Sequence, residues 1–264
     1  ETWIGGDIHA PFHDKNAMRA SFDQIDLFRP KNIFLHDIFD CWGVNHHERK
    51  NRFLNTAKQM DGRINIEKEV DLAVDCINDF ATSSNDDCRV VVVSSNHDDA
   101  LDRWLREEKI DNLGINAAYF HYLSYNKHKS VKKVSTGFSF EDAFQFTAKE
   151  KLKANYSKES FDKVTFLGRD VSCAILDVEF GYHGDVGVNG SRGSALGLSK
   201  IGIKTTIGHS HSPCVVDGCY QVGVNALIPL GYAKGASSWL HTNCLQYPNG
   251  KRTLINSING EYYL

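Results

Sequence analysis

Short runs of hydrophobic residues alternate with longer segments of mixed polarity in the first part of this chain. Three of these runs cover Thr2–Ile4, Asn32–Leu35 and Arg89–Val93. The last run is rich in valine and too short for a helix, which is typical of a strand buried on both faces. The pattern therefore predicts three buried strands, each followed by polar residues.

Between these runs, apolar residues recur at the spacing of an α-helix. One such stripe covers residues 18–28 and is closed by Pro30, and a longer one covers residues 66–80. Asp98 or Asp99 can cap a third helix that follows the valine-rich run. The order strand, loop, helix predicts an α/β fold.

The second half of the chain is richer in strand-like segments. These are Val164–Leu167, Cys173–Phe180, Thr205–Ile207, Cys214–Val222 and a closing hairpin around Pro248–Gly250. A helix-rich half followed by a strand-rich half predicts two facing mixed sheets covered by helices.

Residues 111–160 fit this alternation less well. They contain an aromatic segment over 119–125, followed by lysines at 127, 129, 132 and 133. We interpret this region as an inserted cap or substrate-handling element within a single catalytic domain that spans residues 1–264.

Composition limits the class of protein. A hydrophobic content of 41% suffices for a full core. A net charge of −3 excludes a globally basic nucleic-acid coat protein but allows a local basic track. We expect no membrane partner, since no apolar run approaches the roughly 20 residues of a membrane span. Seven scattered cysteines favour a reducing cytosol, so we expect a cytoplasmic protein. The missing initiator Met suggests that an upstream segment is absent.

Five short polar motifs follow hydrophobic runs, and together they carry the chemistry. They are Gly6–His9, His36–Asp40, Ser95–Asp98, Tyr182–Asp185 and Gly208–His211. Metal sites in layered α/β folds are built at strand ends, where the sheet fixes the backbone and the turn frees the side chains. The motifs offer Asp, His and Asn but no Cys, which suits Mn, Fe or Zn and argues against a structural thiolate zinc site.

The spacing within two motifs pairs their ligands. Asp7 and His9 are two residues apart, as are His209 and His211, so in an extended chain each pair points to one side. Asp37 has two oxygens that can bridge two ions, whereas the other motifs offer neutral ligands.

The charge count of such a site favours a phosphate ester. Two divalent ions carry four positive charges, and Asp7 and Asp37 return only two negative ones. The remaining positive charge would attract an anionic ester and lower the pKa of a bound water, so that hydroxide can attack the phosphorus. The motifs therefore predict phosphoester hydrolysis.

The five motifs, in this order, resemble those of the calcineurin-like metallophosphoesterase superfamily. The resemblance covers residues 5–213 and implies a four-layer α/β/β/α sandwich with a dinuclear centre at one edge of the sheets. It assigns one metal to Asp7, His9, Asp37 and His211. It assigns the other metal to Asp37, Asn96, His183 and His209. We expect Mn²⁺, with Fe, Zn or Mg as alternatives.

The resemblance also assigns roles around the metals. His97 would be the catalytic histidine that protonates the leaving oxygen, and Asp40 the acid that orients it. Two family glycines are replaced here, by His36 and Ser95. Neither change removes a ligand, so we expect a working site with altered local geometry. His36 is either a substrate or second-layer contact, or a packed histidine at a strand end.

Three weaker features favour DNA as the substrate partner. The first is the form of the Asp37–Asp40 motif, which resembles SbcD-type repair nucleases. Apart from these three features, the overall motif set is similar to nucleases of large bacteriophages. The cationic stretch 45–52 includes Arg49 and Arg52, which could meet a phosphate backbone. The aromatic and lysine-rich region resembles a single-strand groove. Each has a structural alternative: a solvated loop, a solvated helix face or core aromatics.

The loop 187–194 could place Arg192 as an anion clamp, with a flexible loop as the alternative. Cys41 after Asp40 and Asp98 after His97 depart from the protein-phosphatase pattern, which argues against that branch. The lead prediction is a DNase, which would act in the host cytoplasm if phage-encoded. Its rivals are a small-molecule phosphatase or nucleotide phosphodiesterase, and a non-catalytic scaffold. Tight duplex binding could require a homo-oligomer or an upstream domain.

Overall fold

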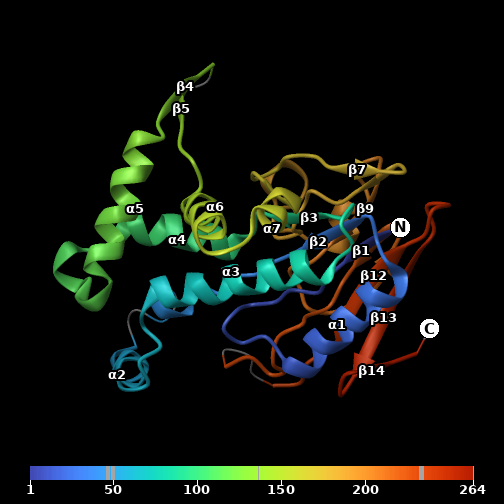
Figure 1. Ribbon diagram of the computed structural model, residues 1–264, viewed down its shortest axis with the longest axis horizontal. Helices are drawn as coiled ribbons and strands as arrows, with labels where there is room; N and C mark the ends of the chain where they lie inside the picture. The colour runs from blue at the N-terminus through green and yellow to red at the C-terminus, as the bar shows by residue number, and fades with distance from the viewer. Residues whose placement is uncertain (46–47, 49–50, 136, 232–234, 264) are drawn as a thin grey trace.

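The computed structural model describes residues 1–45, 48, 51–135, 137–231 and 235–263. Two β-sheets form its centre (Figure 1). The larger sheet has the spatial order β14 (Glu261–Tyr262), β13 (Arg252–Ile258), β12 (His241–Gln246), β1 (Thr2–Ile4), β2 (Asn32–Leu35), β3 (Arg89–Val93), β6 (Val164–Leu167). The smaller sheet has the order β10 (Cys214–Val216), β11 (Cys219–Gln221), β9 (Lys204–Ile207), β8 (Val178–Glu179), β7 (Ala174–Ile175).

The remaining elements connect and cover these sheets. The α-helices are α1 (Lys15–Phe28), α2 (Arg52–Met60), α3 (Ile66–Ser83), α4 (Asn96–Glu107), α5 (Ala117–Lys129), α6 (Ala143–Asn155), α7 (Lys158–Lys163) and α8 (Ala195–Leu198). Short 3-10 turns are η1 (Trp42–Val44), η2 (Ile110–Asn112), η3 (Gly114–Asn116) and η4 (Val188–Gly190). A separate hairpin consists of β4 (Lys132–Val134) and β5 (Gly137–Ser139). None of the described helices is both long and apolar enough to cross a membrane.

Strand direction explains where polar side chains gather. In the larger sheet, β1, β2, β3 and β6 run parallel, and β12 joins β1 antiparallel. In the smaller sheet, β8, β9 and β11 run parallel. Parallel strands end at the same edge of a sheet, so the loops that follow β1, β2 and β3 lie together. The same holds for the loops after β8 and β9.

Two apolar layers hold the elements in place. Phe34 of β2 stacks on Phe180, which follows β8, with ring centroids 5.0 Å apart, so the two sheets face each other. On the other face of the larger sheet, Trp3 packs on Phe80 of α3. The short helix α8 packs through Leu198 on the far side of the smaller sheet. The α/β class with two mixed sheets and covering helices is thus as expected, and it is compatible with the expected four-layer sandwich.

The third helix begins earlier than the sequence predicts. Ser95, not Asp98 or Asp99, is its N-cap, because the Ser95 hydroxyl accepts from the Asp98 N–H and the Asp98 carboxylate accepts from the Ser95 N–H. Asn96 and His97 therefore lie in the first turn of α4. Ser95, in extended backbone, caps this helix at the position where the resemblance implies a glycine.

The region predicted as an insertion is divided between two environments. α6 and α7 pack against α3, and Phe144 of α6 is fully buried and stacks on Phe39 with centroids 5.0 Å apart. The β4–β5 hairpin instead extends away from the helical layer (Figure 1). Helices α6 and α7 are therefore packed against the rest of the domain, whereas the hairpin is not.

Candidate metal centre

The structure brings all five polar motifs together where the two sheets face each other. Asp7 and Asp37 follow β1 and β2, and Asn96 with His97 opens α4 after β3. From the smaller sheet, one ligand loop follows β8 and another follows β9. Each side chain is thus held by a strand end, as the sequence predicts.

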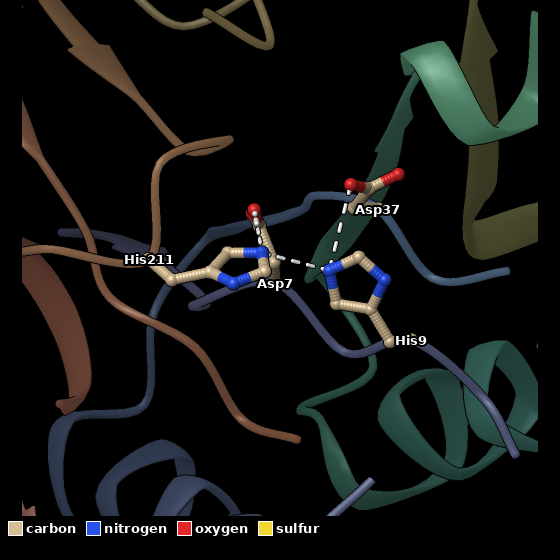
Figure 2. A group of neighbouring side chains, drawn as sticks. All are labelled: Asp7, His9, Asp37 and His211. Carbon is tan, nitrogen blue, oxygen red and sulfur yellow. Dashed lines mark hydrogen bonds and ion pairs between the residues drawn. The ribbon is translucent and has the colours of Figure 1, made fainter. Parts of the chain in front are cut away.

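The tightest group of potential ligands joins the first and last motifs. Asp7, His9, Asp37 and His211 are buried, and one ligand atom of each lies within 4.8 Å of the others. Figure 2 shows the two imidazoles pointing toward each other and toward the carboxylates. Nε2 of His211 lies 2.9 Å from Nε2 of His9 and 3.3 Å from Oδ2 of Asp7. This cluster can hold a metal ion.

A second group shares Asp37 with the first. Its Oδ2 lies 3.4 Å from Nε2 of His183 and 3.6 Å from Nε2 of His9, so one carboxylate serves both groups. Oδ1 of Asn96 is 3.0 Å from Nδ1 of His209, and the rings of His183 and His209 are 5.3 Å apart. These are the residues that the family resemblance assigns to a second metal.

The backbone of the ligand loops is unusual. His9, Asp37, His209 and His211 all have positive φ, at 51°, 44°, 75° and 61°. Residues other than glycine rarely adopt this conformation, and such strain concentrates at functional sites. The strand ends therefore bend sharply to aim these side chains inward, a feature that residue spacing alone does not reveal.

Gly208 leaves the space that the Asp7 carboxylate occupies. A Cβ at this position would lie 2.3 Å from Oδ1 of Asp7. The N–H of the next residue, His209, donates to Oδ2 of Asp7 at 2.8 Å. The Gly-His-x-His motif thus supplies space and an N–H donor for the Asp7 carboxylate, in addition to two imidazoles.

Burial and the attraction between carboxylates and imidazoles set the protonation states of the buried residues in the site. Burial alone would raise the pKa of Asp7, but His183 and His211 lower it to about 2. Burial opposes protonation of His9, yet Asp37 and Asp40 raise its pKa to about 9. His183 behaves in the same way, with a pKa of about 9 beside Asp37. Without an ion, protonated imidazoles would balance the carboxylates.

The donor set fits divalent cations. In the described part of the chain, Oδ1 of Asp7 and Oδ1 of Asp37 are buried and accept no hydrogen bond. Buried carboxylate oxygens without partners are costly unless a cation contacts them. Oxygen and imidazole ligands without thiolate are those of Mn, Fe and Zn sites.

The contacts of Asp40 differ from those that the resemblance implies. Its buried carboxylate lies 3.1 Å from Nδ1 of His9, and a carboxylate oxygen also lies within 4.8 Å of a ring nitrogen of His97. Nδ1 of His97 donates to the main-chain carbonyl of Asp40 instead. The physical reason is position: the carboxylate is fully buried beneath His9, whereas His97 lies at the cavity wall.

A cavity of about 610 Å³ opens onto the ligands. Asp37, His97, His209 and His211 line one side of it. The other lining residues described are Asn45, Glu48, Arg192, Gly193, Ser210 and Trp239. Arg192 thus lies on the cavity wall, where the sequence places an anion clamp, although it belongs to an exposed loop.

The other substrate candidates lie elsewhere. His36 is fully buried and contacts His183, with their Nδ1 atoms 3.5 Å apart, so its place is behind a ligand and not on the cavity wall. Arg52 is exposed at the start of α2 and is not among the lining residues described. Arg49 lies outside the described residues.

Two neighbours of the site were not anticipated. Trp239 packs edge-on against His211 with centroids 4.4 Å apart, and no periodicity marks it in the sequence. Arg169 pairs with Asp99 of α4 at 3.4 Å and with Asp185 beside His183, and so joins ligand loops of the two sheets. Its position directly after a strand-like run could have identified it.

Comparison with known proteins gives one informative similarity. The chain is 32% identical over 266 residues to Protein A1 of Escherichia phage T5, a match that covers 98% of this chain and 46% of that protein. The chain thus spans about half the length of the curated relative it matches. No known family and no solved structure matches the chain.

Proposed function

We propose that this protein is a dinuclear-metal phosphodiesterase that hydrolyses DNA. The observation that carries the proposal is the position of Asp37, which lines an open cavity and contacts residues of both groups. A carboxylate shared in this way is what two neighbouring ions need. The similarity to a phage protein fits an enzyme that acts in the host cytoplasm.

The two groups of residues would each hold one metal ion. Asp7, His9, Asp37 and His211 would hold one ion, and Asp37, Asn96, His183 and His209 the other. Bound ions would supply Lewis acidity and a water of lowered pKa.

Two residues on the cavity wall would handle the substrate. His97 is fixed by its bond to the Asp40 carbonyl, and its Nε2 lies 3.8 Å from Asp37. It is therefore placed to donate a proton to the leaving oxygen. Arg192, on the same cavity, can pair with a phosphate oxygen and hold the diester against the site.

The size of the cavity favours one alternative. A volume of about 610 Å³ lies within the range of pockets that enclose small ligands, so a nucleotide phosphodiesterase or small-molecule phosphatase is the second candidate. A polynucleotide would need contacts outside this cavity, and a mononucleotide would not.

The test is hydrolysis in Mn²⁺ by wild type and by His97→Ala. Linear duplex DNA, single-stranded DNA and bis-p-nitrophenyl phosphate are offered separately, with His121→Ala as an exposed histidine control. We expect DNA cleavage that is lost only in His97→Ala. Cleavage of the small diester alone would favour the nucleotide phosphodiesterase, and no hydrolysis of any substrate would favour a scaffold.

A further inference from the structure

The β4–β5 hairpin with its flanking residues, 131–135 and 137–140, forms an arm that extends from the helical layer (Figure 1). Every described residue of this arm is exposed. An isolated two-stranded hairpin is at best marginally stable in water, and this one has no buried face. Packing therefore does not explain which side chains it carries.

The arm and the end of α5 are strongly cationic. Residues 125–140 contain four lysines and one histidine but no aspartate or glutamate, in a chain whose net charge is −3. Lys127 is neutralised by Asp102 at 2.6 Å. Among the described residues, Lys132 and Lys133 have no ion-pair partner. The positive charge at the arm is therefore available to an anion.

Aromatic rings lie among these cations. Phe138 is 70% exposed and stands directly across the hairpin from Lys133. Tyr125 is 62% exposed, with Nζ of Lys129 5.1 Å from its ring centre. Exposed rings beside lysines are costly to leave in water and are the pattern used to stack bases and hold phosphates.

A cavity of about 300 Å³ lies at the base of the arm, between α4, α5 and Phe140, which follows β5. Phe140 and Leu105 give it apolar walls, and its polar lining consists of Ser124, Arg106, His128 and the Asp102–Lys127 ion pair. It can accept a flat apolar group such as a base, whose phosphate would then lie toward the lysines of the arm.

We propose that the arm and its basal cavity bind single-stranded nucleic acid outside the metal centre. This inference rests on the proposed function, since it supplies the additional contacts that a polynucleotide needs. A single strand is favoured over a duplex because exposed rings stack only on unpaired bases. An anionic membrane could use the same lysines and rings but would leave the basal cavity without a role.

The test measures binding apart from hydrolysis. Fluorescence anisotropy with a labelled oligothymidylate in EDTA compares wild type, Lys132→Gln/Lys133→Gln and Phe138→Ala. The matched control is Lys200→Gln/Lys251→Gln, two exposed lysines that lie in loops elsewhere in the chain. Hydrolysis of bis-p-nitrophenyl phosphate in Mn²⁺ is measured for each variant.

We expect each arm variant to bind roughly tenfold more weakly, whereas the control binds as wild type. The double lysine variant should also show a salt dependence shallower by about 1.4 in log–log slope, from two lost phosphate contacts. Hydrolysis of the small diester should not change. Arm-dependent binding without hydrolysis by wild type would reject the proposed function and retain the binding site.

Equal oligothymidylate affinities of wild type and arm variants would overturn the inference. Two other results would overturn it if the arm variants bound the oligonucleotide as wild type does. One is weaker binding of the arm variants to phosphatidylserine vesicles. The other is a change in their oligomeric mass, measured by light scattering.

Discussion

The carboxylate of Asp40 lies 3.1 Å from Nδ1 of His9, and both side chains are completely buried. This contact fixes the ring so that Nε2 faces Asp37 and His211. Carboxylates behind ligating histidines set the tautomer and raise the basicity of the ligand. Asp40 therefore belongs to the candidate metal centre through its contact with His9.

Asp40→Asn should weaken Mn²⁺ binding about 10- to 100-fold. Its kcat at saturating Mn²⁺ should stay close to that of wild type, because His97 uses the main-chain carbonyl of residue 40. Calorimetric titration gives the affinity, and diester hydrolysis gives the rate. Unchanged affinity with a fall in kcat would instead show that the carboxylate acts through His97.

His97→Gln should lower kcat by roughly 10²- to 10⁴-fold while Mn²⁺ affinity is retained. The loss should be larger for an ester with an alkoxide leaving group than for a p-nitrophenyl ester, whose leaving group needs less protonation. Rates of both esters at saturating Mn²⁺ check this. An equal loss for both would contradict proton donation by His97.

The convergence of the five motifs could be predicted, because each motif follows a hydrophobic run and the carboxyl ends of parallel strands meet. The contacts of Asp40 could not, since they depend on the left-handed backbone of His9 and Asp37, which spacing does not specify. The stacking of Phe39 on Phe144 could not be predicted either, because the two residues lie far apart in the sequence.

Metal removal should destabilise the fold. An ion that binds only the native state at a hundredfold excess over its Kd adds about 2.7 kcal/mol to the free energy of unfolding. Because the pKa of His9 and of His183 is about 9, both protons must leave before an ion binds. The Mn²⁺-induced rise in Tm should therefore shrink as pH falls from 8 to 6. Melting with Mn²⁺ and with EDTA checks this, and a pH-independent rise would contradict it.

Glu69 should make stability depend on pH. It is buried and accepts N–H bonds from Trp42 and Gly43, and burial, helped by Asp40, raises its pKa to about 8 from 4.5. The folded protein then holds a proton that the unfolded chain has lost. This contribution to stability is complete below pH 4.5 and is lost as pH rises through 8.

Urea denaturation of wild type and Glu69→Gln between pH 5 and 8 measures this effect. The wild-type free energy of unfolding should fall by up to about 1.4 kcal/mol per pH unit relative to the variant. The two proteins are compared by the slope of the unfolding free energy against pH. Its absolute value is not compared, because Glu69→Gln also removes one acceptor of an N–H bond. Parallel slopes would show that Glu69 keeps an ordinary pKa.

Phe144 tests whether α6 belongs to the domain core or to a removable cap. Its ring stacks on Phe39 with an interplanar angle of 7°, and both side chains are fully buried. Phe144→Ala should cost about 3–5 kcal/mol of unfolding free energy, whereas Phe144→Leu, which keeps most of the volume, should cost much less. Because Phe39 lies between Asp37 and Asp40, the alanine variant should also bind Mn²⁺ more weakly. Denaturation and Mn²⁺ titration of both variants measure these effects, and a Phe144→Ala variant as stable as wild type would assign α6 to a cap.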